Sequence, residues 1–315
     1  MSFLKKTILK LVGRRKIEFL RSKPFLVHGK YRTLINDLEK YSDIITRSTG
    51  VDTAVSLLMV RKFGHILDKG LQRSDLERGH SGSIAGELKK HIEIAEKEFS
   101  DDPTLLWAKE KLELYNELQV NGLVTIKEQH PEPCGISLND FALLLRNRRS
   151  NRSFQRRVVS SELIGQLART VNWAPSSCNK QPIVLFATTD PELARECLKC
   201  CKGGTGFSDF VPVFVSFTAD MRGYYLPDEA YVPAIDVALG VQNFLLSAEL
   251  TGLSVTTLSW ALKDIGDETR LRELLSIPEH NQIIINVVLG YPEKHSEAPV
   301  RKGPEHSLFL KGKVR

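Results

Sequence analysis

The feature that most constrains this chain is a stretch of turn-forming residues that separates two halves with different hydrophobic periodicities. It runs from Val120 to Ser137 and contains Asn-Gly, His-Pro and Glu-Pro-Cys-Gly sequences, which favour loops over regular elements. Segments of this kind commonly separate domains. A chain of 315 residues that is 42% hydrophobic can bury two cores. We therefore predict one unit over residues 1–125 and a second over residues 126–315.

The first half has the hydrophobic spacing of helices and no strand pattern. Between residues 31 and 119, apolar residues recur three and four positions apart, which predicts an all-α extension of about four helices. One helix should begin at Pro103, because proline suits the first turn and the carboxylate of Asp102 can cap it.

The second half alternates helical patterns with short β-branched and aromatic runs, which predicts an α+β unit with a mixed or antiparallel sheet flanked by helices. The strand patterns lie at residues 183–188, 211–218, 254–258 and 283–289, and the clearest helices at 138–147, from 160 or 161 to 171, and 233–251. The last of these has apolar residues on more than one face. We expect it to be buried nearly all round, with a subunit interface as part of its cover.

Composition and charge indicate which ligands and which cellular compartment suit the protein. The formal charge of +6 is compatible with phosphorylated ligands, and no basic and aromatic pattern typical of nucleic-acid binding occurs. Five cysteines in a chain of this length argue against a disulfide framework and indicate a cytoplasmic location. Cys197 and Cys201 fall on one helical stripe with Leu193, Ala194 and Leu198, so we interpret the cluster of Cys197, Cys200 and Cys201 as packing residues in preference to metal ligands.

Residues 1–21 alternate apolar and basic residues at helical spacing. The pattern predicts a basic amphipathic helix, either docked on an anionic membrane at its inner face or packed on its own domain or a partner protein. Its charges are unlike the apolar core of a signal peptide, and no run is long enough to predict a transmembrane helix.

Two polar segments, separated by one predicted helix, carry the chemistry of the second half. The first, Arg148 to Phe154, brings three guanidinium groups and a hydroxyl together at a helix end, a donor density suited to a phosphate. The second, Ala174 to Pro182, has a proline near each end and short hydroxyl and amide side chains between. It predicts a rigid turn that presents polar groups to a flat heterocycle.

These two segments are similar to the Arg-Arg-Ser-x-Arg-x-Phe and Ala-Pro-Ser-Ser-x-Asn-x-Gln-Pro patterns of the FMN-dependent nitroreductase-like flavoproteins. The helix from Asp236 to Gly252 resembles the long central helix of that family. Val288 to Pro292 and Pro299 to Lys302 resemble its closing strand and basic tail. The resemblance covers about Leu138 to Pro304 and does not extend to the helical half.

The resemblance implies an NAD(P)H-dependent flavoenzyme that works as a homodimer, with FMN at the subunit interface. The flavin carries the redox chemistry, hydride comes from NADH or NADPH, and a small organic acceptor is reduced by a ping-pong sequence. No catalytic side chain and no metal ligand is then expected. The implied FMN-binding residues are Arg148, Arg149, Ser150, Arg152, Pro175, Ser176, Ser177, Asn179, Gln181, Ser259, Trp260 and Arg301, with Lys302 as a second phosphate contact.

Two further functions stay open at this point. The flavin could instead oxidise a biosynthetic intermediate, or the chain could be a non-catalytic scaffold. The scaffold hypothesis depends on Trp260. Together with Ser259, this residue occupies the positions where the family often has an acidic residue and a glycine beside the flavin N5 edge. An indole there would narrow the substrate pocket.

Overall fold

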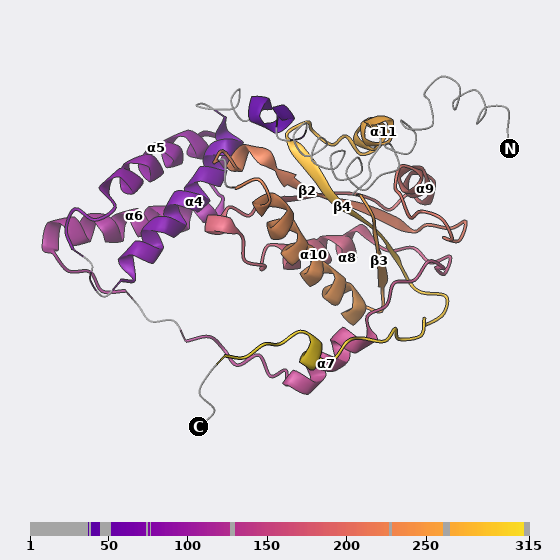
Figure 1. Ribbon diagram of the computed structural model, residues 1–315. Helices are drawn as coiled ribbons and strands as arrows, with labels where there is room; N and C mark the ends of the chain where they lie inside the picture. The colour runs from indigo at the N-terminus through magenta and orange to yellow at the C-terminus, as the bar shows by residue number, and fades with distance from the viewer. Residues whose placement is uncertain are drawn as a thin grey trace, which may run out of the picture.

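The computed structural model describes residues 37, 39–44, 52–73, 75, 77–126, 130–226, 229–260 and 265–311. The amphipathic helix predicted for residues 1–21 lies outside this set. Over the described residues the chain folds into helices and one antiparallel sheet (Figure 1). The predicted α+β class is therefore confirmed.

Three helices of the first half pack on one another: α4 (Thr53–Leu71), α5 (Gly82–Phe99) and α6 (Pro103–Asn121). Leucines at helical spacing fill the space between them, among them Leu67, Leu88 and Leu105, each nearly inaccessible to solvent. The predicted start of α6 is confirmed, because the carboxylate of Asp102 accepts a hydrogen bond from the Thr104 amide at 2.7 Å. We refer to these helices as the helical unit.

The sheet consists of β1 (Ile183–Thr188), β2 (Val213–Asp220), β3 (Ser254–Leu258) and β4 (Asn281–Gly290) in the order β1-β2-β4-β3. All neighbours are antiparallel, so of the two predicted sheet types the antiparallel one is observed. β1 and β3 have the predicted bounds. β2 begins after Pro212, which can therefore lie next to the sheet without having to donate a ladder hydrogen bond.

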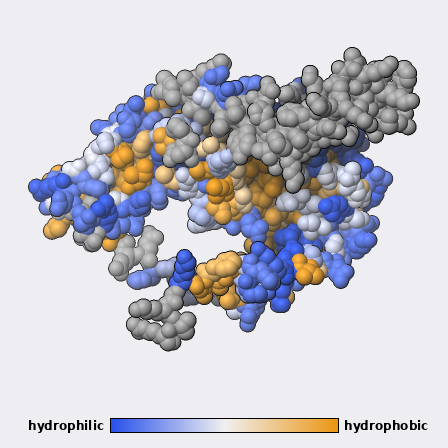
Figure 2. Space-filling view, viewed as in Figure 1, coloured by the Kyte–Doolittle hydropathy of each residue, from blue (hydrophilic) through white to orange (hydrophobic). Residues whose placement is uncertain are grey.

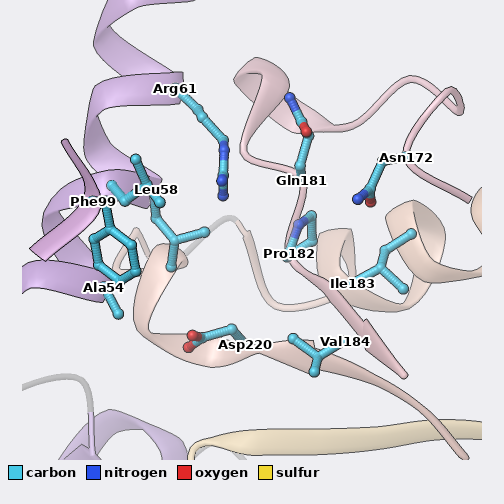
Figure 3. Close-up of a pocket in the computed structure, with 11 residues that line it drawn as sticks. Ala54, Leu58, Arg61, Phe99, Asn172, Gln181, Pro182, Ile183, Val184 and Asp220 are labelled. Carbon is cyan, nitrogen blue, oxygen red and sulfur yellow. The ribbon is translucent and has the colours of Figure 1, made fainter. Parts of the chain in front are cut away.

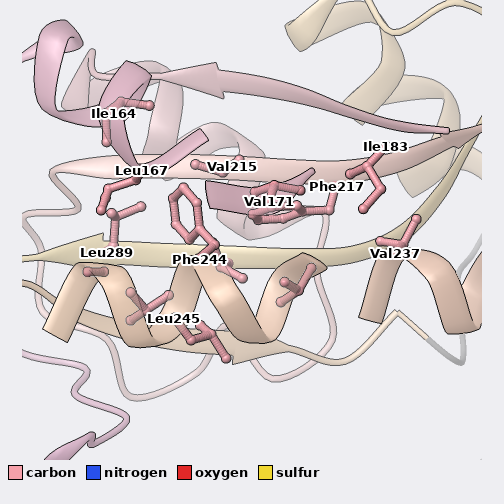
Figure 4. Close-up of a cluster of buried hydrophobic side chains, with 14 of the residues drawn as sticks. Ile164, Leu167, Val171, Ile183, Val215, Phe217, Val237, Phe244, Leu245 and Leu289 are labelled. Carbon is pink, nitrogen blue, oxygen red and sulfur yellow. The ribbon is translucent and has the colours of Figure 1, made fainter. Parts of the chain in front are cut away.

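Helices cover both faces of the sheet. On one face α8 (Ser161–Val171) and α10 (Val232–Leu250) enclose a core with Phe217 and Phe244 in edge-to-face contact (Figure 4). On the other face α9 (Pro191–Lys199) and α11 (Ile265–Leu275) pack with Phe214, Val288 and Leu271. β2 is fully buried because alternate residues enter the two cores.

The packing interpretation of the cysteine stripe is confirmed. Cys197, Cys200 and Cys201 are buried in the second core, and burial raises the pKa of the Cys197 thiol to about 12. Among the described residues no group of three or more histidine, cysteine or acidic side chains could hold a metal ion. Within the same residues no helix is both long and apolar enough to cross a membrane.

Gly240 sets how closely α10 approaches its neighbours. A β-carbon at this position would lie 2.4 Å from Cδ1 of Ile183 and 3.0 Å from the carbonyl oxygen of Val171. Gly240→Ala is therefore expected to lower the free energy of unfolding by about 1–3 kcal/mol, the usual effect of overpacking. Chemical denaturation measures this change.

Gly165 provides the matched control, because a β-carbon on this residue of α8 would meet nothing within 4 Å. Gly165→Ala should raise the free energy of unfolding by about 0.5–1 kcal/mol, since alanine is the better helix former. Equal effects of the two substitutions would show that the close approach at Gly240 is wrong.

Within a single chain the long helix α10 is not buried all round, so the predicted cover would have to include the expected subunit interface. Ile235, Leu239 and Leu250 of α10 are 43–72% exposed. α7 (Leu138–Asn147) buries none of its residues, and its Leu138 is 82% exposed. Figure 2 shows the strip that contains α7 standing away from most of the molecule, with apolar surface on it. No described residue of the same chain covers these apolar helix faces.

Candidate functional site

The arginine segment runs from the end of α7 along the edge of the sheet formed by β3. The Ser254 hydroxyl donates to the carbonyl of Arg149 at 2.8 Å, and the amide of Asn151 donates to the same hydroxyl at 2.8 Å. Phe154 is buried in the second core and pairs with Pro292, just after β4. Asn151 and Phe154 thus anchor the segment, while Arg152 between them stays exposed.

The arginines of this segment are not neutralised by protein carboxylates. Over the described part of the chain, Arg148, Arg149 and Arg152 make no ion pair. The Nε atom of Arg149 is buried without a hydrogen-bond partner, and Arg148 has only a 3.5 Å contact with the Ser150 hydroxyl. A buried donor without a partner costs free energy. The segment is therefore suited to an anionic ligand, since none of the described carboxylates pairs with it.

A pocket of about 430 Å³ opens beside this segment. Three stretches of chain line it: Ser150–Ser153, Gly206–Ser208, and the tail after β4 at Lys294 and Ser296. The guanidinium of Arg152 stacks 5.8 Å from the ring centre of Phe207. The predicted Ser150 and Arg152 thus line one pocket. Phe207, Lys294 and Ser296 were missed, because no motif or spacing marks them.

The second segment, Ala174 to Pro182, forms a constrained turn around the short helix η1 (Ser177–Asn179). Cys178, Asn179 and Gln181 have φ values of 50°, 55° and 51°, a region that non-glycine residues adopt at a cost of about 1–3 kcal/mol each. Hydrogen bonds hold the turn, including Gln181 N to the Ser176 hydroxyl at 3.0 Å and the Gln181 amide to the Asn179 oxygen at 3.1 Å. The predicted rigid turn is observed.

Two buried carboxylates fix this turn from beneath. Asp236, in the first turns of α10, accepts from the Ser177 amide at 3.1 and 3.0 Å and from the Tyr224 hydroxyl at 2.7 Å. Burial raises the pKa of Tyr224, and its hydrogen bond to Asp236 raises it further. Lys180 is fully buried and pairs with Glu229. The backbone of the turn is therefore preorganised by a buried ionic network.

A single chain does not bring the two segments together. The turn is tied to Asp236 near the start of α10, whereas the arginine segment is tied to Ser254, beyond the end of that helix. The 14 residues from Asp236 to Leu250 span about 20 Å at 1.5 Å per residue. The two segments, the candidate half-sites, lie at opposite ends of α10.

The remaining predicted site residues lie elsewhere. Trp260 is buried in the second core, and its indole is not among the groups that line the pocket. Ser259 is exposed and pairs its backbone with Lys202.

Pro175 is exposed, and Ser176 and Ser177 belong to the turn. Arg301 and Lys302 are exposed in the tail. The tail itself reaches the arginine segment through a hydrogen bond from Ser296 to Asn151.

The structure is thus an α+β fold in which the arginine segment makes no ion pair among the described residues and the second segment forms a constrained polar turn. Residues 145–210 match the model of the Nitroreductase family, which confirms the resemblance drawn from the two motifs.

The chain is similar to the following proteins over about half of its length. An FMN reductase [NAD(P)H] of Bacillus subtilis is 26% identical over 171 residues, 50% of this chain and 68% of the relative. An NADPH-dependent oxidoreductase of Staphylococcus epidermidis is 26% identical over 184 residues, which are 53% of this chain and 71% of the relative. An FMN-dependent nitroreductase structure from Clostridium difficile has a TM-score of 0.46 at 20% identity and covers 54% of this chain and 98% of its own.

Proposed function

We propose that the chain is an FMN-dependent oxidoreductase of nitroreductase type. It would take hydride from NADH or NADPH and reduce a small organic acceptor by a ping-pong sequence. The observation that carries this proposal is Arg152 in the lining of the pocket, preceded by Arg148 and Arg149, with no ion pair to any of the three arginines among the described residues. The family match and the names of the relatives support it.

The residues present fit a phosphorylated flavin. Arg148, Arg149 and Arg152 would bind the phosphate with charge-assisted, partly bidentate hydrogen bonds, and Arg301 from the exposed tail would add a further contact. Lys294 and Ser296 bring donors to the same pocket. When bound, FMN supplies the hydride-accepting ring. The side chains of this protein would hold and orient that ring.

The turn would contact the ring and the ribityl chain, through Asn179 and Gln181 above all. Asparagine offers both a donor and an acceptor to a heterocycle edge. Because the backbone of the turn is fixed by Asp236 and Lys180, these amides would need little reorganisation on binding. Trp260 lies in the core and so leaves the pocket open to a substrate. This placement favours an enzyme over a scaffold.

We propose that the two halves meet across a homodimer. A two-fold axis near the middle of α10 would place the turn of one chain against the arginine segment of the other. The exposed apolar residues of α7 and α10 provide a surface for this contact. A shared site also accounts for why neither half is complete in a single chain.

Subunit mixing tests the shared site. The chain Arg148→Ala/Arg152→Ala and the chain Asn179→Ala/Gln181→Ala are each expected to lose FMN as homodimers. A mixed dimer carries one site with both halves intact and one with both halves damaged. Co-purified mixed dimers with two different tags should therefore regain FMN at about half the wild-type occupancy. Mixed dimers without flavin would contradict sharing and place both halves in one chain.

We also propose a cytoplasmic location, which the cysteine content supports. Residues 1–21 are proposed to dock on an anionic membrane or on a partner. Sedimentation with anionic vesicles should then be lost when residues 1–21 are deleted. Equal sedimentation of the full and shortened chains would contradict membrane docking through this segment.

A further inference from the structure

A second pocket lies between the helical unit and the start of β1. It has a volume of about 260 Å³ and a wall of apolar side chains from α4, the end of α5 and the first residues of β1. Figure 3 shows this wall as Leu58 and Phe99 on one side and Pro182 and Ile183 on the other. The pocket is smaller than the ~300 Å³ at which sites for drug-sized ligands begin, so any ligand is small.

Arg61 extends from α4 into this space, between Leu58 and Pro182 (Figure 3). Its side chain is only 18% exposed, and its sole ion pair within the described residues is a 3.8 Å contact with Asp102. Its one hydrogen bond in those residues joins Nε to the Thr104 hydroxyl at 3.4 Å. Burial lowers the pKa of Arg61. This guanidinium is thus largely desolvated while most of its donors have no strong acceptor.

Nearby, Arg222 differs from Arg61 because its guanidinium group is fully paired with carboxylates. Arg222 donates Nη2 to Asp220 at 2.7 Å and Nη1 to Asp52 at 2.8 Å, and its Nε also bonds Asp220. Asp220 lines the pocket, but its charge is already compensated by Arg222. Among the residues that line the pocket Arg61 is therefore the one cationic side chain, and Asp102 contacts it at only 3.8 Å.

The polar rim of the pocket also reaches the candidate flavin turn. Gln181 lines the pocket, and its amide donates to the side-chain oxygen of Asn179. A ligand in this pocket would touch the helical unit through Arg61 and the turn through Gln181. Its binding would order both at once.

We propose that this pocket binds a small organic carboxylate with a short apolar body. The carboxylate would accept hydrogen bonds from the open donors of Arg61, because a guanidinium fork matches that group. The apolar body would pack between Phe99 and Pro182. The proposed contacts to Arg61, Phe99 and Pro182 do not involve the flavin, so carboxylate binding is tested separately from the proposed oxidoreductase function.

Calorimetric titration of the full chain tests the site with three carboxylates, acetate, butyrate and benzoate, and with the corresponding amides. Benzoate or butyrate should bind at least about tenfold more tightly than its amide, because only the carboxylate forms charge-assisted bonds. Arg61→Met should remove this preference. Arg73→Met, which changes an exposed arginine paired with Asp75, is the control and should keep it.

A second variant guards against an effect of Arg61→Met on folding. Ala54→Phe would fill the pocket from α4 without altering Arg61, so it should abolish binding while the unfolding transition stays cooperative. The proposal is overturned if no carboxylate binds more tightly than its amide, or if the preference survives in Arg61→Met or in Ala54→Phe. Flavin content, measured on the same samples, shows separately whether the FMN site is intact.

Discussion

Replacing Arg148 and Arg152 together by alanine is expected to remove FMN from the purified protein. Neither arginine has a protein carboxylate as partner in the described residues, so a ligand phosphate would receive their full donor capacity. Each charge-assisted contact contributes about 1.5–3 kcal/mol. Loss of both should weaken FMN binding at least about a hundredfold. Flavin released on denaturation, per mole of chain, measures the occupancy, and quenching of FMN fluorescence on rebinding gives the affinity.

Arg156→Ala/Arg157→Ala is the matched control. These arginines follow the segment directly after Phe154 and Gln155, and their substitution removes the same charge. Their guanidinium groups, however, stack on the rings of Phe210 and Tyr291, at 5.5 and 3.6 Å. The control should keep its FMN. Equal loss of flavin in both double variants would mean that only the overall charge matters, and full occupancy in the Arg148 and Arg152 variant would rule out the proposed phosphate contacts.

Lys180→Met is expected to have the largest effect on stability. The ammonium group is fully buried and pairs with Glu229, which is itself 8% exposed. Removing one partner leaves an uncompensated buried charge, which typically costs about 3–5 kcal/mol of folding free energy. Because Lys180 lies inside the constrained turn, FMN affinity should fall as well. Urea denaturation measures the first effect and flavin content the second.

Two further variants test whether the unpaired Glu229 causes the loss of stability in Lys180→Met. Lys180→Met/Glu229→Leu removes both charges and should recover a large part of the lost stability, because no buried charge is left unpaired. Lys199→Met breaks an exposed pair with Glu196 and should change stability by about 0–1 kcal/mol. If the double variant were no more stable than Lys180→Met alone, the pairing of Lys180 with Glu229 would not explain the effect.

Local patterns predicted the regular elements well, since caps and periodicity act over a few residues. Asp102 and Ser160 cap their helices as expected, and the apolar runs at residues 183–188 and 254–258 are strands with those bounds. The dense polar segments also marked where the half-sites lie. α11 was not predicted, because its Ile265–Leu275 sequence is rich in charged residues and has little apolar periodicity.

Properties that depend on long-range contacts could not be predicted. Lys180 looks like a solvated lysine in sequence, yet it is buried because Glu229, 49 residues away, reaches it. The sequence predicts that Trp260 lies beside the flavin, but the indole is buried in the second core. Lys294 and Ser296 line the pocket because the chain after β4 pairs with the arginine segment. The distance between the half-sites follows from the length of α10 and from which of its ends each segment contacts.

The most direct test of the flavoprotein assignment is the visible absorption spectrum of the purified full chain, recorded without oxygen before and after adding NADH or NADPH. The proposed function predicts the bands of oxidised flavin in the first spectrum and their loss after one of the two donors is added. A chain that stays colourless even after incubation with FMN would contradict the flavin site. Bound FMN whose bands persist with both donors would contradict the proposed reaction.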